Sequence, residues 1–392
     1  MSASREGAAN VTGAWRIAVA GLIALAAAIG IGRFAYTPLL PMMQHDNGLS
    51  ITGGGWLASA NYLGYFAGAV SAVWLRLPAL AMLRVAMVLN ALLIASMGVT
   101  ENLIFWLAIR AAAGIASAWV FVFASTLVLQ RLAECGRVEL SSVMFSGVGI
   151  GMLLPGLMCI VFVANGIDAQ HAWLAFATLA GVAVVVVWLL SGAGQTVVST
   201  DRAEARHRPA WTATMGRLIA SYGLFGLGYI IPATFLPVIA RDLLAGAQIY
   251  VWFWPVCGAA AAVSVIASVG WSRKYGDYSL LMVCCVAEAA GIALPLFAPH
   301  AAAIGVSAVL LGGTFVVITV AALREAHRLA PAHAGSLIAA MTASFALGQI
   351  AGPVIAAYLV TWRGDFAWAL VLAATALLIA GVLLLKSKPE RV

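Results

Sequence analysis

The chain has 392 residues, of which 64% are hydrophobic and only 9% are charged. A soluble domain carries roughly a quarter of its residues as charged side chains, so this composition excludes an ordinary water-soluble protein. The formal net charge of +7 would fit nucleic acid or anionic lipid as a partner. The basic residues lie mainly in the polar connections of the chain, which favours membrane topology and argues against nucleic acid.

Apolar runs of about 20 residues recur along the whole chain, and each is long enough to cross a bilayer as a helix. The alternating pattern of a transmembrane β-barrel is absent. The first run is too long for the core of a signal peptide, so we expect it to be retained. We predict an all-α integral membrane protein with twelve transmembrane helices over residues 15–43, 53–75, 79–99, 102–130, 139–163, 172–191, 212–240, 247–270, 279–297, 301–325, 333–361 and 366–386.

The positions of the basic residues suggest the orientation of these helices. An even number of spans puts both termini on one side. With that side taken as the cytoplasm, 17 of the 21 Lys and Arg residues lie there, and only Arg241 and Arg363 lie outside. The positive-inside rule then predicts cytoplasmic termini in a bacterial-type plasma (inner) membrane.

Five cysteines, four of them in apolar spans, show no metal-ligand spacing, so we expect neither disulfides nor a metal site.

A polar stretch over 192–211 separates two halves that share a sequence pattern. We predict an N-terminal six-helix bundle over 1–191, a cytoplasmic linker over 192–211 and a C-terminal six-helix bundle over 212–392. Several residues recur at a constant offset of 196: Gly30, Gly32, Leu40, Pro41 and Trp56 recur as Gly226, Gly228, Leu236, Pro237 and Trp252. This agreement favours a parallel repeat with the substrate site between its halves.

Three motifs resemble those of the major facilitator superfamily. The run from Gly30 to Pro41, GIGRFAYTPLLP, resembles the first-helix signature of its YbfB/YjiJ-like branch. In the fourth span, Arg110, Gly114 and Ala118 are similar to the superfamily motif whose arginine is linked to proton coupling. In the fifth, Gly147, Gly151, Pro155 and Gly156 are similar to the motif of exporters. The resemblance implies a twelve-helix major facilitator fold in two pseudo-symmetric bundles.

Arg33 is the most informative single residue. It lies about ten residues before the end of the first span, so it is roughly 15 Å deep at 1.5 Å per residue. An unpaired arginine at such depth costs at least ~2.5 kcal/mol, which predicts a wet cavity or a partner. Tyr36 and Thr37 follow at i+3 and i+4, so on an α-helix they would share its face. We interpret Arg33 as an anion-binding residue; the alternative is a structural arginine tied to backbone carbonyls.

Two further buried charges are candidates for proton coupling. Arg110 lies at a depth close to that of Arg33, and two cations at one depth favour an anionic ligand; a helix-packing role is the alternative. Glu288 is the acid in the middle of the ninth span and is a candidate proton carrier. The resemblance implies that the ninth helix lies outside the bundle, which favours a structural role for Glu288.

Other polar, aromatic and helix-breaking residues complete the candidate site. The candidates for the cavity wall are Asn61, Tyr62, Tyr65, Ser117, Tyr229, Trp252, Trp254 and Gln349, each of which is alternatively a packing residue. We expect Gly151, Pro155, Gly352 and Pro353 to let the fifth and eleventh helices bend or approach their neighbours closely. The alternative is the ordinary tolerance of membrane helices for Gly and Pro.

These features predict a secondary transporter, a monomer without cofactors, in the lipid bilayer. We expect it to move a small, anionic organic solute by alternating access with protons as the coupling ion, and the fifth-span motif slightly favours export. An uncoupled facilitator or channel is the first alternative, and a membrane enzyme or receptor is the second. The six histidines form no catalytic cluster in the sequence, and no P-loop or zinc spacing is present.

Overall fold

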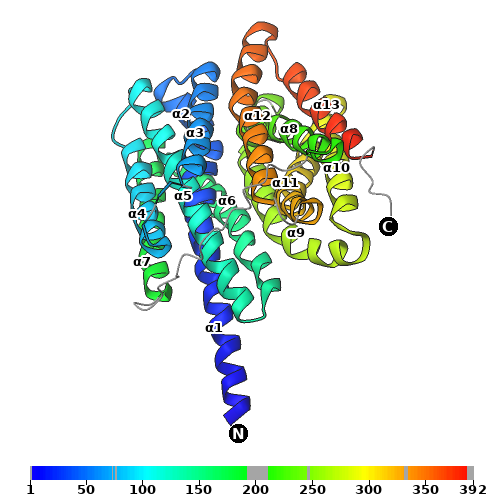
Figure 1. Ribbon diagram of the computed structural model, residues 1–392. Coiled ribbons are helices and arrows are strands. Elements are labelled where there is room, and N and C mark those ends of the chain that lie inside the picture. Colours follow the sequence, from blue (N-terminus) through cyan, green and yellow to red (C-terminus); the bar gives the residue numbers. More distant parts are fainter. Residues whose placement is uncertain are drawn as a thin grey trace.

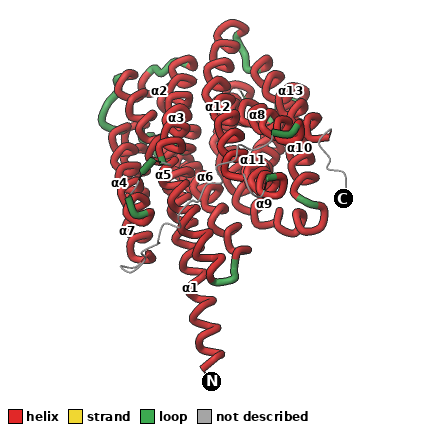
Figure 2. Tube along the Cα trace, viewed as in Figure 1, coloured by secondary structure: helices red, strands yellow, loops and turns green. Residues whose placement is uncertain are grey.

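The computed structural model describes residues 2–72, 74–75, 77–191, 211–244, 248–330 and 334–385, with the side chains of 2–12 and 334–335 left out. The regular elements in these ranges are all helices, as Figure 2 shows. In chain order they are α1 (Ser2–Leu25), η1 (Ala26–Phe34), α2 (Tyr36–Asn47), α3 (Ile51–Ser71), α4 (Ala79–Met97), α5 (Leu103–Glu134), η2 (Val138–Leu140), α6 (Ser141–Ala164), α7 (Ala169–Ser191), α8 (Ala213–Leu243), η3 (Gln248–Trp252), α9 (Phe253–Tyr275), α10 (Asp277–Phe297), α11 (Ala301–Leu329), α12 (Ala334–Arg363) and α13 (Ala367–Leu385).

The prediction of an all-helical membrane protein is confirmed. Eleven helical segments of the described ranges are long and apolar enough to cross a membrane, the first being the combined segment Gly13–Asn47. The predicted second span corresponds to α3, which has 21 residues but is not among the eleven. Five glycines, an asparagine and two tyrosines lower the mean hydropathy of α3 below that of the eleven segments. Most of the predicted linker, 192–210, lies outside the described residues.

Side-chain caps explain where several helices begin. Ser50 precedes α3 and accepts a hydrogen bond from the backbone N–H of Gly53 at 2.9 Å. Asn102 does the same for α5, and Thr212 accepts from Met215 at the start of α8. These caps satisfy backbone donors that have no partner within the helix. At the end of α2, Gly48 adopts a left-handed conformation with φ of 63°, which permits the tight turn into α3.

The first span contains a π-helical segment, η1, between two α-helices. Pro38 and Pro41 follow this segment and have no backbone N–H, so the carbonyls of Phe34 and Thr37 lack their usual α-helical donors. π-Helical turns are rare and are frequent at functional sites. Arg33 lies in the last turn of η1.

The helices form two halves, with α1–α7 on one side and α8–α13 on the other (Figure 1). The contacts between the halves occur in matching pairs: α3 packs on α12, and α6 packs on α9. Within each half the first and fifth spans cross closely at glycines. A Cβ on Gly151 of α6 would lie 2.2 Å from the carbonyl oxygen of Ala26, and one on Gly348 of α12 would lie 2.5 Å from that of Gly223. Small residues permit such close crossings of membrane helices.

Hydrogen bonds join the halves along the parts of α2, α3, α8 and α12 on the side of the α2–α3 and α12–α13 connections. We call this part of the molecule, at the top of Figure 1, the closed end. The Thr37 hydroxyl donates to the carbonyl of Ala233 at 2.7 Å, and these residues are 196 positions apart, the offset of the sequence repeat. Further bonds of the closed end are Ser59 to the Ile350 carbonyl, Tyr62 with Thr234, and Thr52 with Thr361.

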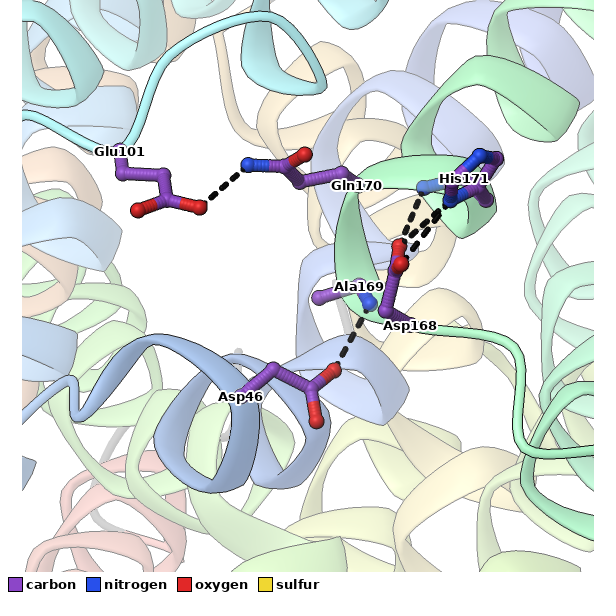
Figure 3. A network of polar contacts seen from close by, with 6 residues as sticks. All are labelled: Asp46, Glu101, Asp168, Ala169, Gln170 and His171. Carbon is purple, nitrogen blue, oxygen red and sulfur yellow. Dashed lines mark hydrogen bonds and ion pairs between the residues drawn. The ribbon is translucent and has the colours of Figure 1, made fainter.

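A polar network also holds the ends of α2 and α7 together (Figure 3). Asp46, near the end of α2, accepts a hydrogen bond from the backbone N–H of Ala169 at 2.8 Å. Asp168 caps the start of α7 through the backbone N–H of His171 at 2.9 Å, and Gln170 donates to Glu101 at 2.5 Å. The two hydrogen bonds from His171 hold the pKa of the Asp168 carboxyl below its ordinary value.

Candidate functional site

Arg33 lies between the two halves and is almost completely buried. Its side chain belongs to η1 and is 5% exposed. Among the ion pairs of the described residues, none involves Arg33. A buried charge is normally paired, so Arg33 is an exception that requires an explanation.

Three aromatic rings surround the Arg33 guanidinium. Its central carbon lies 4.4 Å from the ring centroid of Tyr65, 4.7 Å from that of Tyr62 and 5.4 Å from that of Phe34. Each distance is within the range of cation–π attraction. The rings therefore stabilise the positive charge without accepting its hydrogen bonds.

The donor nitrogens Nε and Nη2 of Arg33 are buried and have no hydrogen-bond partner. These two nitrogens lie on the same edge of the planar guanidinium, and their N–H bonds point in parallel. Such an edge matches the two oxygens of a carboxylate or phosphate. The geometry of Arg33 is therefore suited to bind an anion at this edge.

Arg110, in α5, has partners in the first span. Its Nη1 donates to the carbonyl of Gly32 at 3.2 Å, and its Nη2 donates to the carbonyl of Arg33 at 3.4 Å. Its guanidinium also lies over the ring of Tyr36 at 4.7 Å. Asn61 completes this contact, because its side-chain NH2 donates to the backbone carbonyl of Arg110 at 2.9 Å. Arg110 thus holds the end of the π-helical segment in place.

Tyr36 and Thr37 do not join Arg33 in one polar surface. The Tyr36 hydroxyl donates to the carbonyl of Gly54 at 2.9 Å, and the Thr37 hydroxyl donates to that of Ala233. The expectation of a shared face assumed a regular α-helix. The π-helical turn and the break at Ala35 change the angular position of residues 36 and 37 relative to Arg33.

The opposite wall, from the second half, consists of stacked aromatic rings. Tyr229 stacks on Phe315 with centroids 5.7 Å apart and planes 5° apart, and on Phe345 at 5.6 Å and 10°. Tyr222 stacks on the same Phe345 at 4.8 Å. Gln349 is buried beside them and donates a hydrogen bond to the hydroxyl of Tyr229.

Phe34 connects the two walls. Its ring lies 5.9 Å from Phe315 of α11 and 6.3 Å from Trp254 of α9. Because Phe315 also stacks on Tyr229, Phe34 links the rings around Arg33 to the opposite wall. The structure therefore brings together three predicted site residues, Arg33, Tyr65 and Tyr229.

Trp252 is not part of this cluster. It lies in η3 and is 51% exposed, whereas Trp254, two residues later, is fully buried against Phe34. Its repeat counterpart Trp56 is also exposed, at 46%. Exposed tryptophans near helix ends are typical of membrane interfaces, which explains why this pair recurs in the repeat.

Glu288 lies in α10, where it is fully buried and separate from the aromatic cluster. One of its oxygens accepts a hydrogen bond from the Thr314 hydroxyl of α11 at 3.0 Å, and the other has no partner. Neither the ion pairs nor the hydrogen bonds of the described residues join Glu288 to a basic group. A neutral carboxyl fits this environment better than a charged one.

The Gly and Pro candidates lie at close contacts between helices. Gly151 meets Ala26 and Gly30 of η1, and a Cβ on Gly352 would lie 2.5 Å from the side chain of Ile230. Pro155 and Pro353 lie within continuous helices, α6 and α12. The carbonyl of Pro353 also lies against Gly55 of α3, so this residue takes part in the contact between the halves.

Sequence reasoning missed most of the aromatic wall. Phe315 and Phe345 have no sequence feature that separates them from other apolar residues. A signal was present in α8, where Tyr222, Phe225 and Tyr229 follow at i, i+3 and i+7 and so share one helix face. We call the rings of Phe34, Tyr62 and Tyr65 around the Arg33 guanidinium the Arg33 cage. Tyr62, noted only as a candidate for the cavity wall, contributes both to this cage and to the closed end.

The fold is shared with solved structures of membrane transporters. Solved structures with the same fold include one of a variant of the nucleoside transporter NupG, at 14% identity, with a TM-score of 0.74 and coverage of 95% of this chain and 100% of that one. A second NupG structure has a TM-score of 0.70, with 15% identity and coverage of 96% and 100%. The human organic anion transporter MFSD10 (TETRAN) has a TM-score of 0.66 at 13% identity, with coverage of 95% and 99%.

The family follows from a match along most of the chain. The family model described as "Uncharacterised MFS-type transporter YbfB" matches residues 25–385, and the chain belongs to this family. Among curated proteins, none matches. The protein is therefore a multi-pass membrane protein of a transporter family, and it is a transporter rather than an enzyme.

Proposed function

We propose that this protein is a secondary transporter that moves a small organic anion across the plasma membrane by alternating access. The observation that carries the proposal is the buried edge of Arg33, whose two donor nitrogens have no partner. An anion bound at this edge would pair the charge and satisfy both donors. It would also offset the cost of at least ~2.5 kcal/mol for an unpaired arginine deep in the membrane.

The arrangement of the halves supports alternating access. Four hydrogen bonds join the halves at the closed end, and Tyr62 connects this end to the Arg33 cage. In the opposite direction the rings of Tyr65, Phe121 and Phe145 follow one another at 6.5 and 6.3 Å and are only half-buried. An anion would reach Arg33 from this side, which the positive-inside rule assigns to the cytoplasm.

We also propose protons as the coupling ion and export as the net direction. Glu288 is the candidate proton carrier, because it is a buried carboxyl with one unpartnered oxygen. This oxygen can take up or release a proton without breaking an ion pair. The proposal of export is based on the glycine–proline motif of α6. Its Gly151 lies against the first span, and its Gly156 lies against α9. An uncoupled facilitator is the competing function, and transport by the Glu288→Gln variant separates it from a proton-coupled transporter.

The test is a panel of ligands on the purified protein. Carboxylates, phosphates, sulfonates and organic cations are added singly, and the thermal unfolding temperature is measured for wild type and Arg33→Gln. We expect at least one class of anion to stabilise the wild type and to lose this effect in the variant. Arg363→Gln is the matched control, because Arg363 also lies over aromatic rings, those of Trp362 and Trp368, but outside the site. Stabilisation by organic cations alone would overturn the proposal.

A further inference from the structure

The Arg33 cage determines how a ligand can approach. Three rings already lie against the guanidinium, at 4.4 to 5.4 Å. The edge with Nε and Nη2 is the part whose donors have no partner. A charged group of a ligand therefore binds in the plane of the guanidinium, and the rest of the ligand lies beyond that edge, among the surrounding side chains.

Those side chains are mostly flat rings. The second half presents Tyr222, Phe345, Tyr229 and Phe315 as a stack, with neighbouring centroids 4.8 to 5.7 Å apart and planes within 20°. Within this stack Phe345 is half-buried, and so is Tyr65 in the first half. These two rings therefore keep part of their surface accessible, one on each side of the interface between the halves.

Three of the hydroxyl groups nearby are already paired, whereas the indole N–H of Trp254 has no partner. The Tyr229 hydroxyl accepts from Gln349, the Thr37 hydroxyl donates to Ala233, and the Tyr36 hydroxyl donates to Gly54. A substrate rich in hydroxyl groups would find few free partners here, and each hydroxyl left without one would cost about 1–3 kcal/mol. A substrate with a flat apolar body has no such cost.

We propose that the transported anion is an aromatic carboxylate, held by its carboxylate at the free edge of Arg33 and by its ring against Tyr65 and Phe345. This inference rests on the proposed function, because it specifies the substrate class of the same site. Stacked and tilted ring pairs at 4.5 to 7 Å contribute affinity beyond the buried area alone. A saturated ring of the same size and charge lacks this contribution.

The experiment compares matched acids on the purified, full-length protein. Benzoate is compared with cyclohexanecarboxylate, phenylacetate with cyclohexylacetate, and benzylamine serves as the cationic ring. Dissociation constants are obtained from the dependence of the unfolding temperature on ligand concentration. We expect the aromatic acid of at least one pair to bind about 3- to 10-fold more tightly than its saturated partner, and benzylamine not to bind.

Two variants assign the difference to the stacked wall. Phe345→Leu should remove most of the preference for the aromatic acid and keep the binding of the saturated acid. Phe162→Leu is the control, because Phe162 pairs with Phe176 at 5.9 Å in the first half, away from this wall, and should leave the preference unchanged.

The possible results separate the two proposals. Equal binding of aromatic and saturated acids, lost in Arg33→Gln, would overturn the aromatic class and leave the anion transporter in place. A preference that persists in Phe345→Leu would overturn the assigned wall. Binding of benzylamine without binding of any acid would overturn both proposals together.

Discussion

At the scale of single residues, the two buried arginines differ in their partners. Arg110 donates to the carbonyls of Gly32 and Arg33, whereas the Nε and Nη2 atoms of Arg33 have no partner. The sequence placed both at one depth and left a structural role open for each. Only the Nε of Arg110 lacks a partner, whereas Arg33 has a whole free edge. The tertiary contacts therefore favour structure for Arg110 and ligand binding for Arg33, because two-point binding of an anion needs two neighbouring free donors.

We expect Arg110→Gln to destabilise the protein. The variant loses charged hydrogen bonds to two buried carbonyls, each worth about 1.5–3 kcal/mol, and the unfolding temperature in detergent should fall by several degrees. Arg131→Gln is the control, because Arg131 pairs with Glu134 near the surface, where an ion pair contributes about 0–1 kcal/mol. An Arg110→Gln protein as stable as wild type would contradict the structural role.

Glu288→Gln tests proton coupling. Glutamine has the same shape and can keep the hydrogen bond with Thr314, so we expect a folded protein of nearly unchanged stability. If Glu288 carries the proton, uptake against a gradient into proteoliposomes should fall to background while exchange across the membrane persists. Unchanged accumulation by the variant would mean that Glu288 has a structural role and that another group carries the proton. A wild-type protein that never accumulates substrate would support the uncoupled facilitator.

At the scale of helices, glycine contacts and caps determine how the elements meet. Gly151 allows α6 to touch the backbone of Ala26, and Asp46 and Asp168 complete the start of α7. Such contacts join elements that are distant in the sequence. They set the positions of the first and fifth spans of the N-terminal half, and with them the position of η1 and Arg33.

Gly151→Ala should be strongly destabilising. The added Cβ would lie 2.2 Å from the carbonyl oxygen of Ala26, so one of the two helices must shift, at about 1–3 kcal/mol or more. Gly181→Ala is the matched control within a helix, since no atom lies within 4 Å of its added Cβ. Alanine there should stabilise α7 by about 0.5–1 kcal/mol, and thermal unfolding of both variants distinguishes the two effects.

Asp168→Ala should weaken the start of α7 in a pH-dependent way. Loss of an N-cap costs about 0.5–2 kcal/mol. The carboxylate is the form that accepts the His171 hydrogen bonds, which lower its pKa, so its contribution is present above the ordinary pKa of about 3.9. This contribution is lost as pH falls through the lowered value in the folded state. Unfolding temperatures of wild type and variant should therefore converge in acid; a constant difference would contradict this origin.

At the scale of the whole molecule, the two halves meet at the closed end through side chains of both repeats. Thr52 of α3 and Thr361 of α12 lie with their hydroxyl oxygens 3.2 Å apart, and Thr37 of the first half bonds to Ala233 of the second. Alternating access requires these contacts to separate during each transport cycle. They are therefore the place where a covalent link should stop transport.

Cysteines at positions 52 and 361 test this motion. In a background without the five native cysteines, we expect Thr52→Cys with Thr361→Cys to form a disulfide on oxidation, because the two side chains already touch. Transport into proteoliposomes should stop on oxidation and return with a reductant. Each single cysteine variant is the control, and full transport by the cross-linked protein would contradict the proposed motion.

The sequence by itself determined the helical membrane class and the family signature, and it singled out Arg33 as a candidate, because hydrophobicity, Gly and Pro spacing and a charge within an apolar run are local properties. Only the tertiary structure decided what surrounds Arg33. The π-helical turn moved Tyr36 and Thr37 away from its face, and Trp252 lies outside the cluster. Phe315 and Phe345 come from helices far along the chain, 282 and 312 residues after Arg33. Aromatic residues look alike in an apolar sequence, and helix packing alone selects those that face the charge.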